Sequence, residues 1–218
     1  MSITANLQQV LTDLPAGVRL VAVSKYYPKE AIEEAYRAGQ RIFGESRVQD
    51  MTAKYESLPQ DIEWHFIGHL QTNKIKYIIP YVSLIHGIDS YSLLNEINKQ
   101  AIKAERIVNI LLQLHIAQEE TKFGFSQDEC REMLASGKWK ELTGIRICGM
   151  MGMSSNTDCE EQIEREFCSL KTFFDEMRET CFATQPSFGE LSMGMSHDYL
   201  IAVKAGSTLV RIGSKIFA

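Results

Sequence analysis

The sequence predicts an α/β fold, a single (β/α)8 TIM-type barrel with an extra N-terminal helix, formed by residues 1–218 as one domain. Eight short apolar runs alternate with amphipathic segments, which is typical of parallel βαβ units. A chain of 218 residues is close to the lower size limit of this barrel and short for two domains. No glycine-rich fingerprint follows the first run, which disfavours the alternative of a doubly wound open sheet.

The eight apolar runs are the expected strands, because they are too short for helices and suit strands that are buried on both faces. In chain order they are RLVAVS (19–24), RIFGE (41–45), EWHFIG (63–68), VSLIHGID (82–89), VNILLQLHI (108–116), IRICGMM (145–151), FGELSM (188–193) and TLVRIG (208–213).

Helical spacing marks the segments between these runs. Apolar residues recur every three or four positions from Ile163 to Cys181, which predicts an amphipathic helix there. The leading segment from Ile3 to Leu14 has the same spacing and supplies an eighth helix. We expect this helix to cover the place where a helix after the last strand would otherwise pack.

Composition excludes several classes of function. The net charge is −5 and no basic run is present, so we expect no nucleic-acid partner. The five cysteines form no Cys-x-x-Cys pair, and the histidines have no metal-ligand spacing and suit hydrogen-bonded strand ends, so we expect reduced thiols and no metal. The first residues lack a secretory pattern and no run could span a membrane, which predicts a cytoplasmic protein.

Polar residues at the carboxyl ends of the strands are the candidate site residues, because barrels of this type carry their active sites there. Lys25 directly follows the first strand, and strand alternation places it on the same side as Val21 and Val23. If that side faces the interior, burial favours the neutral amine that a Schiff base requires. The alternative is a solvated lysine at a strand end.

Arg211 is a second candidate, because it interrupts the apolar strand at the end of the chain. A charged side chain in such a strand is rarely buried without a partner. A pyridine nitrogen, a carboxylate or a phosphate would each suit it. The alternative is a structural ion pair with a strand-end acid such as Glu45.

The segments that follow the seventh and eighth strands suit a phosphate, because phosphate sites are frequently built there in this fold. They are Ser192-Met193-Gly194-Met195-Ser196 and the turn Gly213-Ser214. Ser196 is expected to cap a helix, and the glycines would let the backbone approach an anion. The alternative is an ordinary turn and an ordinary helix cap.

Five motifs, which follow one another along the chain, resemble those of a known protein family. They are AVSKYYP (22–28), FGESRVQ (43–49), WHFIGHLQTNK (64–74), ETKFG (120–124) and LSMGMSHDYLIAVKAGSTLVRIGSKIF (191–217). From Leu20 to Phe217 the chain resembles the YggS/PROSC family of pyridoxal phosphate homeostasis proteins. The family fold is a single barrel similar to the N-terminal domain of alanine racemase.

This resemblance implies roles for the candidate residues. Lys25 would hold pyridoxal 5'-phosphate as a Schiff base, with Lys74 and Lys122 as the competing lysines. Arg211 would face the pyridine nitrogen. Ser196, Gly213 and Ser214 would hold the phosphate. Ser192 and Met195 would lie close to it. Many members have asparagine where this chain has Ser46, and the shorter serine would reach the ring hydroxyl through a water.

Three functions are compatible with such a site. The first is a carrier or buffer of the cofactor without substantial catalysis, with cofactor-free enzymes as recipients and the protein itself a monomer or weak homodimer. The second is a pyridoxal phosphate-dependent racemase or decarboxylase. Alanine racemase adds a second domain, and we expect none after Ala218. A third alternative is an aldolase-like barrel in which Lys25 attacks a sugar phosphate directly, which would not absorb visible light.

Overall fold

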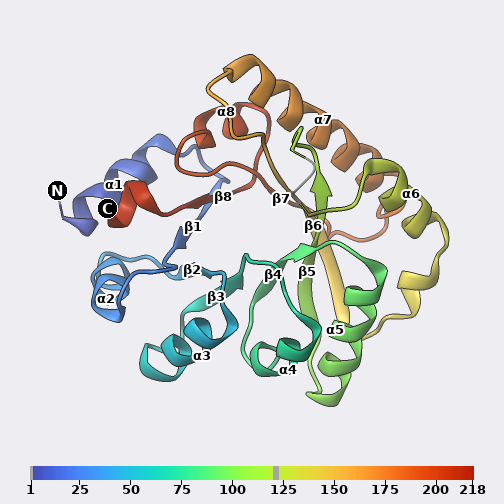
Figure 1. The fold of residues 1–218 in the computed structure, drawn as a ribbon, viewed down its shortest axis with the longest axis horizontal. Coiled ribbons are helices and arrows are strands. Elements are labelled where there is room, and N and C mark those ends of the chain that lie inside the picture. Colours follow the sequence, from blue (N-terminus) through green and yellow to red (C-terminus); the bar gives the residue numbers. More distant parts are fainter. Residues whose placement is uncertain (1, 120–122) are drawn as a thin grey trace.

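Eight parallel strands close into a barrel in chain order, which confirms the predicted fold class (Figure 1). The structure is a computed structural model that describes residues 2–119 and 123–218. The strands are Arg19–Val23 (β1), Ile42–Glu45 (β2), Glu63–Phe66 (β3), Leu84–Ile88 (β4), Val108–His115 (β5), Ile145–Met153 (β6), Glu190–Ser192 (β7) and Leu209–Ile212 (β8). Each one lies within or overlaps a predicted run.

Helices surround the strands on the outside of the barrel (Figure 1). They are Ile3–Asp13 (α1), Lys29–Arg37 (α2), Val48–Ser57 (α3), Ile75–Ile78 (α4), Tyr91–Lys103 (α5), Gln127–Ala135 (α6), Glu160–Glu179 (α7), Tyr199–Lys204 (α8) and Ser214–Phe217 (α9), with short 3-10 helices at Thr72–Lys74 and Lys138–Glu141. In the described ranges, no helix is long and apolar enough to cross a membrane.

The predicted helix ends are wrong by one or two residues. α7 ends at Glu179, so Cys181 lies beyond it, where the Phe182 amide bonds back to the Met177 carbonyl and the chain turns. α1 ends at Asp13, and Leu14 is the residue after its last turn. Spacing identifies a helix but not its last turn, where the hydrogen bonding changes.

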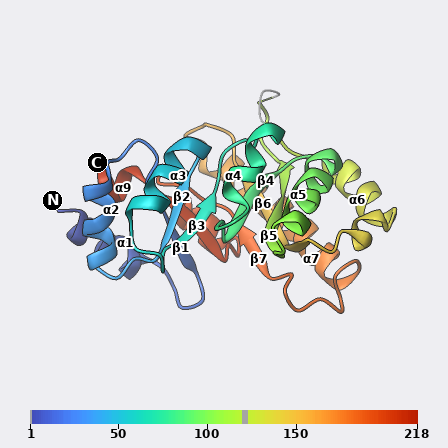
Figure 2. The ribbon, with the colours of Figure 1, turned by 90° about the horizontal axis from the view of Figure 1, so that it is seen from below.

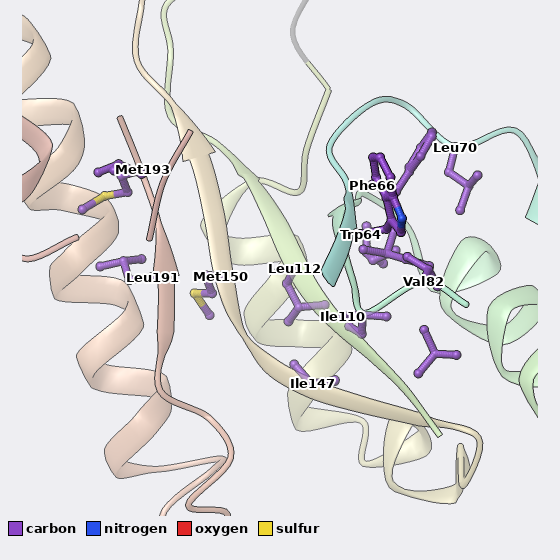
Figure 3. Packing of buried hydrophobic residues seen from close by; sticks show 14 of the residues in the cluster. Trp64, Phe66, Leu70, Val82, Ile110, Leu112, Ile147, Met150, Leu191 and Met193 are labelled. Atoms are coloured by element: carbon purple, nitrogen blue, oxygen red, sulfur yellow. The ribbon is translucent and has the colours of Figure 1, made fainter. Parts of the chain in front are cut away.

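The core has two layers because side chains of a buried strand alternate between the barrel interior and the helices. The outer layer is the larger one, and Figure 3 shows part of it, including Trp64, Phe66, Ile110 and Met150. Burying one such side chain contributes roughly 1.5–3 kcal/mol. The apolar cluster of the interior is small: Val21, Leu84, Leu111, Cys148, Met151 and Leu209.

The leading helix packs where it was predicted. α1 lies beside α9, and both chain termini are at the same end of the molecule (Figure 2). The Asn6 amide donates to the Ile216 carbonyl at 3.2 Å, and Tyr199 donates to Asp13 at 2.7 Å. The short helix α9 itself was not predicted. Together α1 and α9 brace the end of β8, which leads into the candidate site.

Candidate functional site

A cavity of about 310 Å³ opens at the carboxyl ends of the strands. It lies between the segments that follow β1, β7 and β8, as expected for this barrel. Most of the predicted site residues meet in it. Its lining consists of Val23, Lys25, Tyr26, Tyr27, Ile67, Met153, Met195, Ser196, His197, Arg211, Gly213 and Ser214.

The lining of this cavity suits an anion. It contains the cations Lys25 and Arg211 and two serine hydroxyls, and no described residue of the lining is acidic. A larger hollow of about 580 Å³ lies beside α5 and α6, but its lining is net acidic, with Asp89, Glu129 and Glu132 against one lysine, Lys138. A phosphate would therefore be favoured in the smaller cavity and repelled in the larger one.

Lys25 sits on a tight turn at the end of β1. The Tyr27 amide donates to the Ser24 carbonyl at 3.1 Å, and Tyr26 has a φ of 71°. A positive φ at the third position of a turn usually requires glycine, so an aromatic residue there is strained. The turn leaves the Lys25 side chain exposed. Of the two alternatives for this amine, the described structure therefore has the exposed lysine, and its place at the cavity is as predicted.

A buried ion pair anchors this turn from below. The Lys54 ammonium of α3 contacts the Glu45 carboxylate at 2.6 Å and donates to the Ser24 carbonyl at 3.0 Å. The Ser24 hydroxyl donates to the same Glu45 oxygen at 2.7 Å. Glu45 is fully buried, and its second oxygen has no partner within the described residues. The end of β1 is thus fixed by two elements that do not reach the cavity.

Arg211 forms part of the cavity wall and is otherwise buried, with 4% of its surface exposed. Its guanidinium donates to the Ser192 carbonyl at 2.9 Å, to the Ser192 hydroxyl at 2.5 Å and to the Gly152 carbonyl at 3.1 Å. Burial lowers its pKa to about 10, so it stays charged at neutral pH. The alternative of an ion pair with Glu45 is wrong, because Glu45 pairs with Lys54.

Ser196 does not cap a helix, contrary to the expectation. Asp198 precedes α8, and its carboxylate accepts from the Met195 amide at 2.6 Å. The Ser196 hydroxyl accepts from the Gly213 amide at 3.2 Å, which joins the segments after β7 and β8. This bond leaves the proton of the Ser196 hydroxyl free to point at an anion in the cavity.

The glycines of these segments are needed for packing. Gly194 has a φ of 90°, and a side-chain carbon there would lie 2.7 Å from the Ala202 methyl on α8. A side-chain carbon on Gly213 would lie 2.9 Å from the Val23 carbonyl on β1. The close approach of an anion to these glycines stays a prediction, and the geometry gives packing as a further reason for them.

Two predicted residues lie outside the cavity lining. Ser46 follows β2, and its backbone packs closely against Gly68. A side-chain carbon on Gly68 would lie 2.4 Å from the Ser46 carbonyl oxygen. Ser192 is fully buried beneath Arg211. Of the competing lysines, Lys74 is in the 3-10 helix after β3, away from the cavity, and Lys122 lies outside the described residues.

The sequence interpretation missed several residues of the site. Tyr26, Tyr27 and His197 line the cavity, and their places next to Lys25 and Ser196 in the sequence were the available signal. His65 and His86 are hydrogen-bonded, as expected, but they lie inside the barrel and not at strand ends. Among the residues with described positions, no group of three or more histidines, cysteines and acids could hold a metal ion.

Comparison with known proteins identifies the class of this chain first. The family model for the N-terminal domain of alanine racemase matches residues 1–218. Alanine racemases from Clostridium difficile and Streptomyces coelicolor superimpose with TM-scores of 0.74 and 0.77 at 14% and 17% identity, covering 99% and 98% of this chain and 55% and 57% of theirs. At this identity the likeness concerns the fold.

More similar relatives define the group within that class. Proteins named pyridoxal phosphate homeostasis protein from Aquifex aeolicus and Helicobacter pylori are 38% and 37% identical, covering 91% and 92% of this chain and 86% and 87% of theirs. PipY of Synechococcus elongatus, solved without and with PLP, superimposes over 100% of both chains at 34% identity, with TM-scores of 0.93 and 0.89. The chain therefore belongs to the alanine racemase N-terminal domain family, and within it to the pyridoxal phosphate homeostasis proteins.

Proposed function

We propose that the protein binds pyridoxal 5'-phosphate in the cavity beside Lys25 and carries or buffers this cofactor without substantial catalysis. The observation that carries the proposal is the donor set of the cavity. It combines an amine, a buried arginine, hydroxyls and aromatic rings, and none of its described lining residues is a carboxylate. An anionic, aromatic aldehyde matches each of these groups.

The chain's own residues suit distinct parts of the cofactor. Bound pyridoxal phosphate would supply an aldehyde, and the Lys25 amine would hold it as a Schiff base. Ser196, Gly213 and Ser214 surround the end of the cavity where we place the phosphate, with Met195 beside them. Ser46 would reach the ring hydroxyl only through a water, because it lies outside the lining.

Arg211 disfavours catalysis in this proposal. A guanidinium beside the pyridine nitrogen opposes protonation of that nitrogen and so weakens the ring as an electron sink. Lys25 is exposed, which leaves a bound cofactor open to hydrolysis or to exchange with another amine. The names of the curated relatives describe homeostasis, which supports the same role.

The experiment is transfer from the loaded protein to a cofactor-free pyridoxal phosphate enzyme. We expect the loaded protein to restore the activity of that enzyme, and to show no substantial racemase or decarboxylase turnover on common amino acids. Lys25→Ala should bind the cofactor less tightly and restore less activity. Robust turnover of any single amino acid by the wild type, lost in Lys25→Ala, would overturn the carrier role in favour of an enzyme.

A further inference from the structure

A row of four polar side chains crosses the barrel interior beneath the cavity. Nη1 of Arg211 (β8) donates to the Ser192 hydroxyl (β7) at 2.5 Å. That hydroxyl lies 3.1 Å from Nδ1 of His86 (β4), and Nε2 of His86 lies 3.1 Å from Nδ1 of His65 (β3). All four residues are buried, with 0–4% of their surface exposed. No step of the proposed function uses the two histidines.

The direction of these bonds follows from the arginine. A guanidinium only donates, so the Ser192 oxygen must accept from Arg211. The single Ser192 proton is then left to donate, and His86 Nδ1 is its remaining partner in the described part of the interior. His86 therefore carries its proton on Nε2 and donates to His65 Nδ1. The opposite order would leave the buried Ser192 proton without an acceptor, which is costly.

Both imidazoles are neutral, so each carries a single ring proton. Burial lowers the pKa of His65 to about 3 and that of His86 well below its ordinary value. The cations that face the pair, Arg211 from β8 and Arg19 from β1, act in the same direction. Arg19 is paired with Glu190 at 2.6 Å. The direction of the bonds is therefore stable around neutral pH.

The guanidinium keeps donors free on its other side. Three of its five N–H groups are used by the two Ser192 oxygens and the Gly152 carbonyl. The Nε N–H and one Nη2 N–H have no protein partner within the described residues. Because Arg211 lines the cavity, these two groups are the ones available to a bound molecule.

We propose that Ser192, His86 and His65 are positioning residues that form a one-directional hydrogen-bond chain and hold the Arg211 guanidinium toward the ring of the bound cofactor. The identity of that cofactor rests on the proposed function. The direction of the hydrogen-bond chain is determined by residues of the protein alone and does not require a bound ligand. Arg211 thereby keeps one orientation although no acid pairs with it in the described structure.

The first test is nitrogen-15 NMR of the ligand-free protein with labelled imidazoles. Variants of the other three histidines, His69→Gln, His115→Gln and His197→Gln, assign the two remaining rings. We expect both rings to be neutral and protonated on Nε2 at pH 7. A ring protonated on Nδ1, or a mixture of the two forms, would overturn the direction of the chain. This result does not depend on whether pyridoxal phosphate binds.

The second test compares Ser192→Ala, which removes the hydroxyl, with Ser192→Thr, which keeps it. With pyridoxal phosphate as the probe, we expect Ser192→Ala to shift the visible band and to raise the Kd by about tenfold, and Ser192→Thr to remain near wild type. If Ser192→Ala has the same spectrum and Kd as the wild type, Ser192 does not position the Arg211 guanidinium. If the wild type itself binds no pyridoxal phosphate, the proposed function fails, and the NMR result still decides on the chain. The NMR result also tests the direction of the chain if a Ser192 variant does not fold.

Discussion

Arg211 is held by the protein whether or not a ligand is present, and its three acceptors are all uncharged. A buried cation without a paired acid among the described residues is costly, so we expect a bound ligand to accept hydrogen bonds from it. Lys25 differs, because it is exposed and free to react. We therefore propose different tasks for the two cations of the cavity: Arg211 would orient the cofactor ring, and Lys25 would form the covalent bond.

Replacing Arg211 should separate these two tasks. Arg211→Ala is expected to retain the bond between Lys25 and the cofactor, to shift its spectrum and to weaken binding. A charge-assisted hydrogen bond contributes roughly 1.5–3 kcal/mol, which corresponds to about ten- to a hundredfold in Kd. Arg41→Ala is the control, since this arginine is partly exposed and pairs with Asp61. Unchanged Kd and spectrum in Arg211→Ala would show that the guanidinium does not contact the cofactor.

The sequence was informative for residues whose role depends on their own strand. The positions of Lys25 and Arg211 followed from an apolar run and its alternation. The contact between His65 and His86 joins residues 21 positions apart, across the interior of the barrel. It depends on the register of two strands, which no local pattern contains. The exposure of Lys25 depends on Tyr26 in a conformation that usually requires glycine, and nothing in the sequence signals it.

At the scale of elements, the ion pair between α3 and β2 fixes the turn that carries Lys25. Lys54→Met should lower the free energy of unfolding by about 3–5 kcal/mol, because it leaves the Glu45 carboxylate buried without its counterion. Arg131→Ala is the matched control. It breaks an exposed pair with Glu176 and should cost much less than the buried pair. Urea denaturation measures both, and equal losses would show that the buried pair has no special weight.

All eight strands could be predicted because their apolar runs are distinct in length and spacing from the helical segments. Helix ends were less accurate, and α9 was missed because four residues carry too little periodicity. The partners of Glu45 were also missed. An acid at a strand end has the same sequence pattern whether it pairs with Arg211 or with Lys54, and only the orientation of α3 decides.

At the scale of the whole molecule, the buried histidines make stability depend on pH. The pKa of His65 is lowered to about 3 and that of His86 is well below 6.5, so below pH 6.5 the unfolded chain binds more protons than the folded protein. The free energy of unfolding should therefore decrease as the pH is lowered from 6.5 to 5, by about 1.6 kcal/mol for His65, and His86 should act in the same direction. Acidic groups titrate mainly below this window.

Denaturation curves across this pH range test the effect. The double variant His65→Gln/His86→Gln should be less stable at pH 7 but should lose less stability toward pH 5. His197→Gln should keep the wild-type dependence, because the side chain of His197 is 47% exposed. A double variant with the wild-type slope would contradict the assignment of the slope to the buried pair.

The most direct measurement of the central claim is the site of covalent attachment. The protein loaded with pyridoxal phosphate is treated with borohydride, digested, and mapped by mass spectrometry. The account predicts loss of the visible band and a reduced label on Lys25, because this lysine lies at the cavity with Arg211 and Ser196. Lys25→Ala should remain unlabelled under the same conditions. A label found mainly on Lys74 or Lys122, or on no lysine at all, would contradict it.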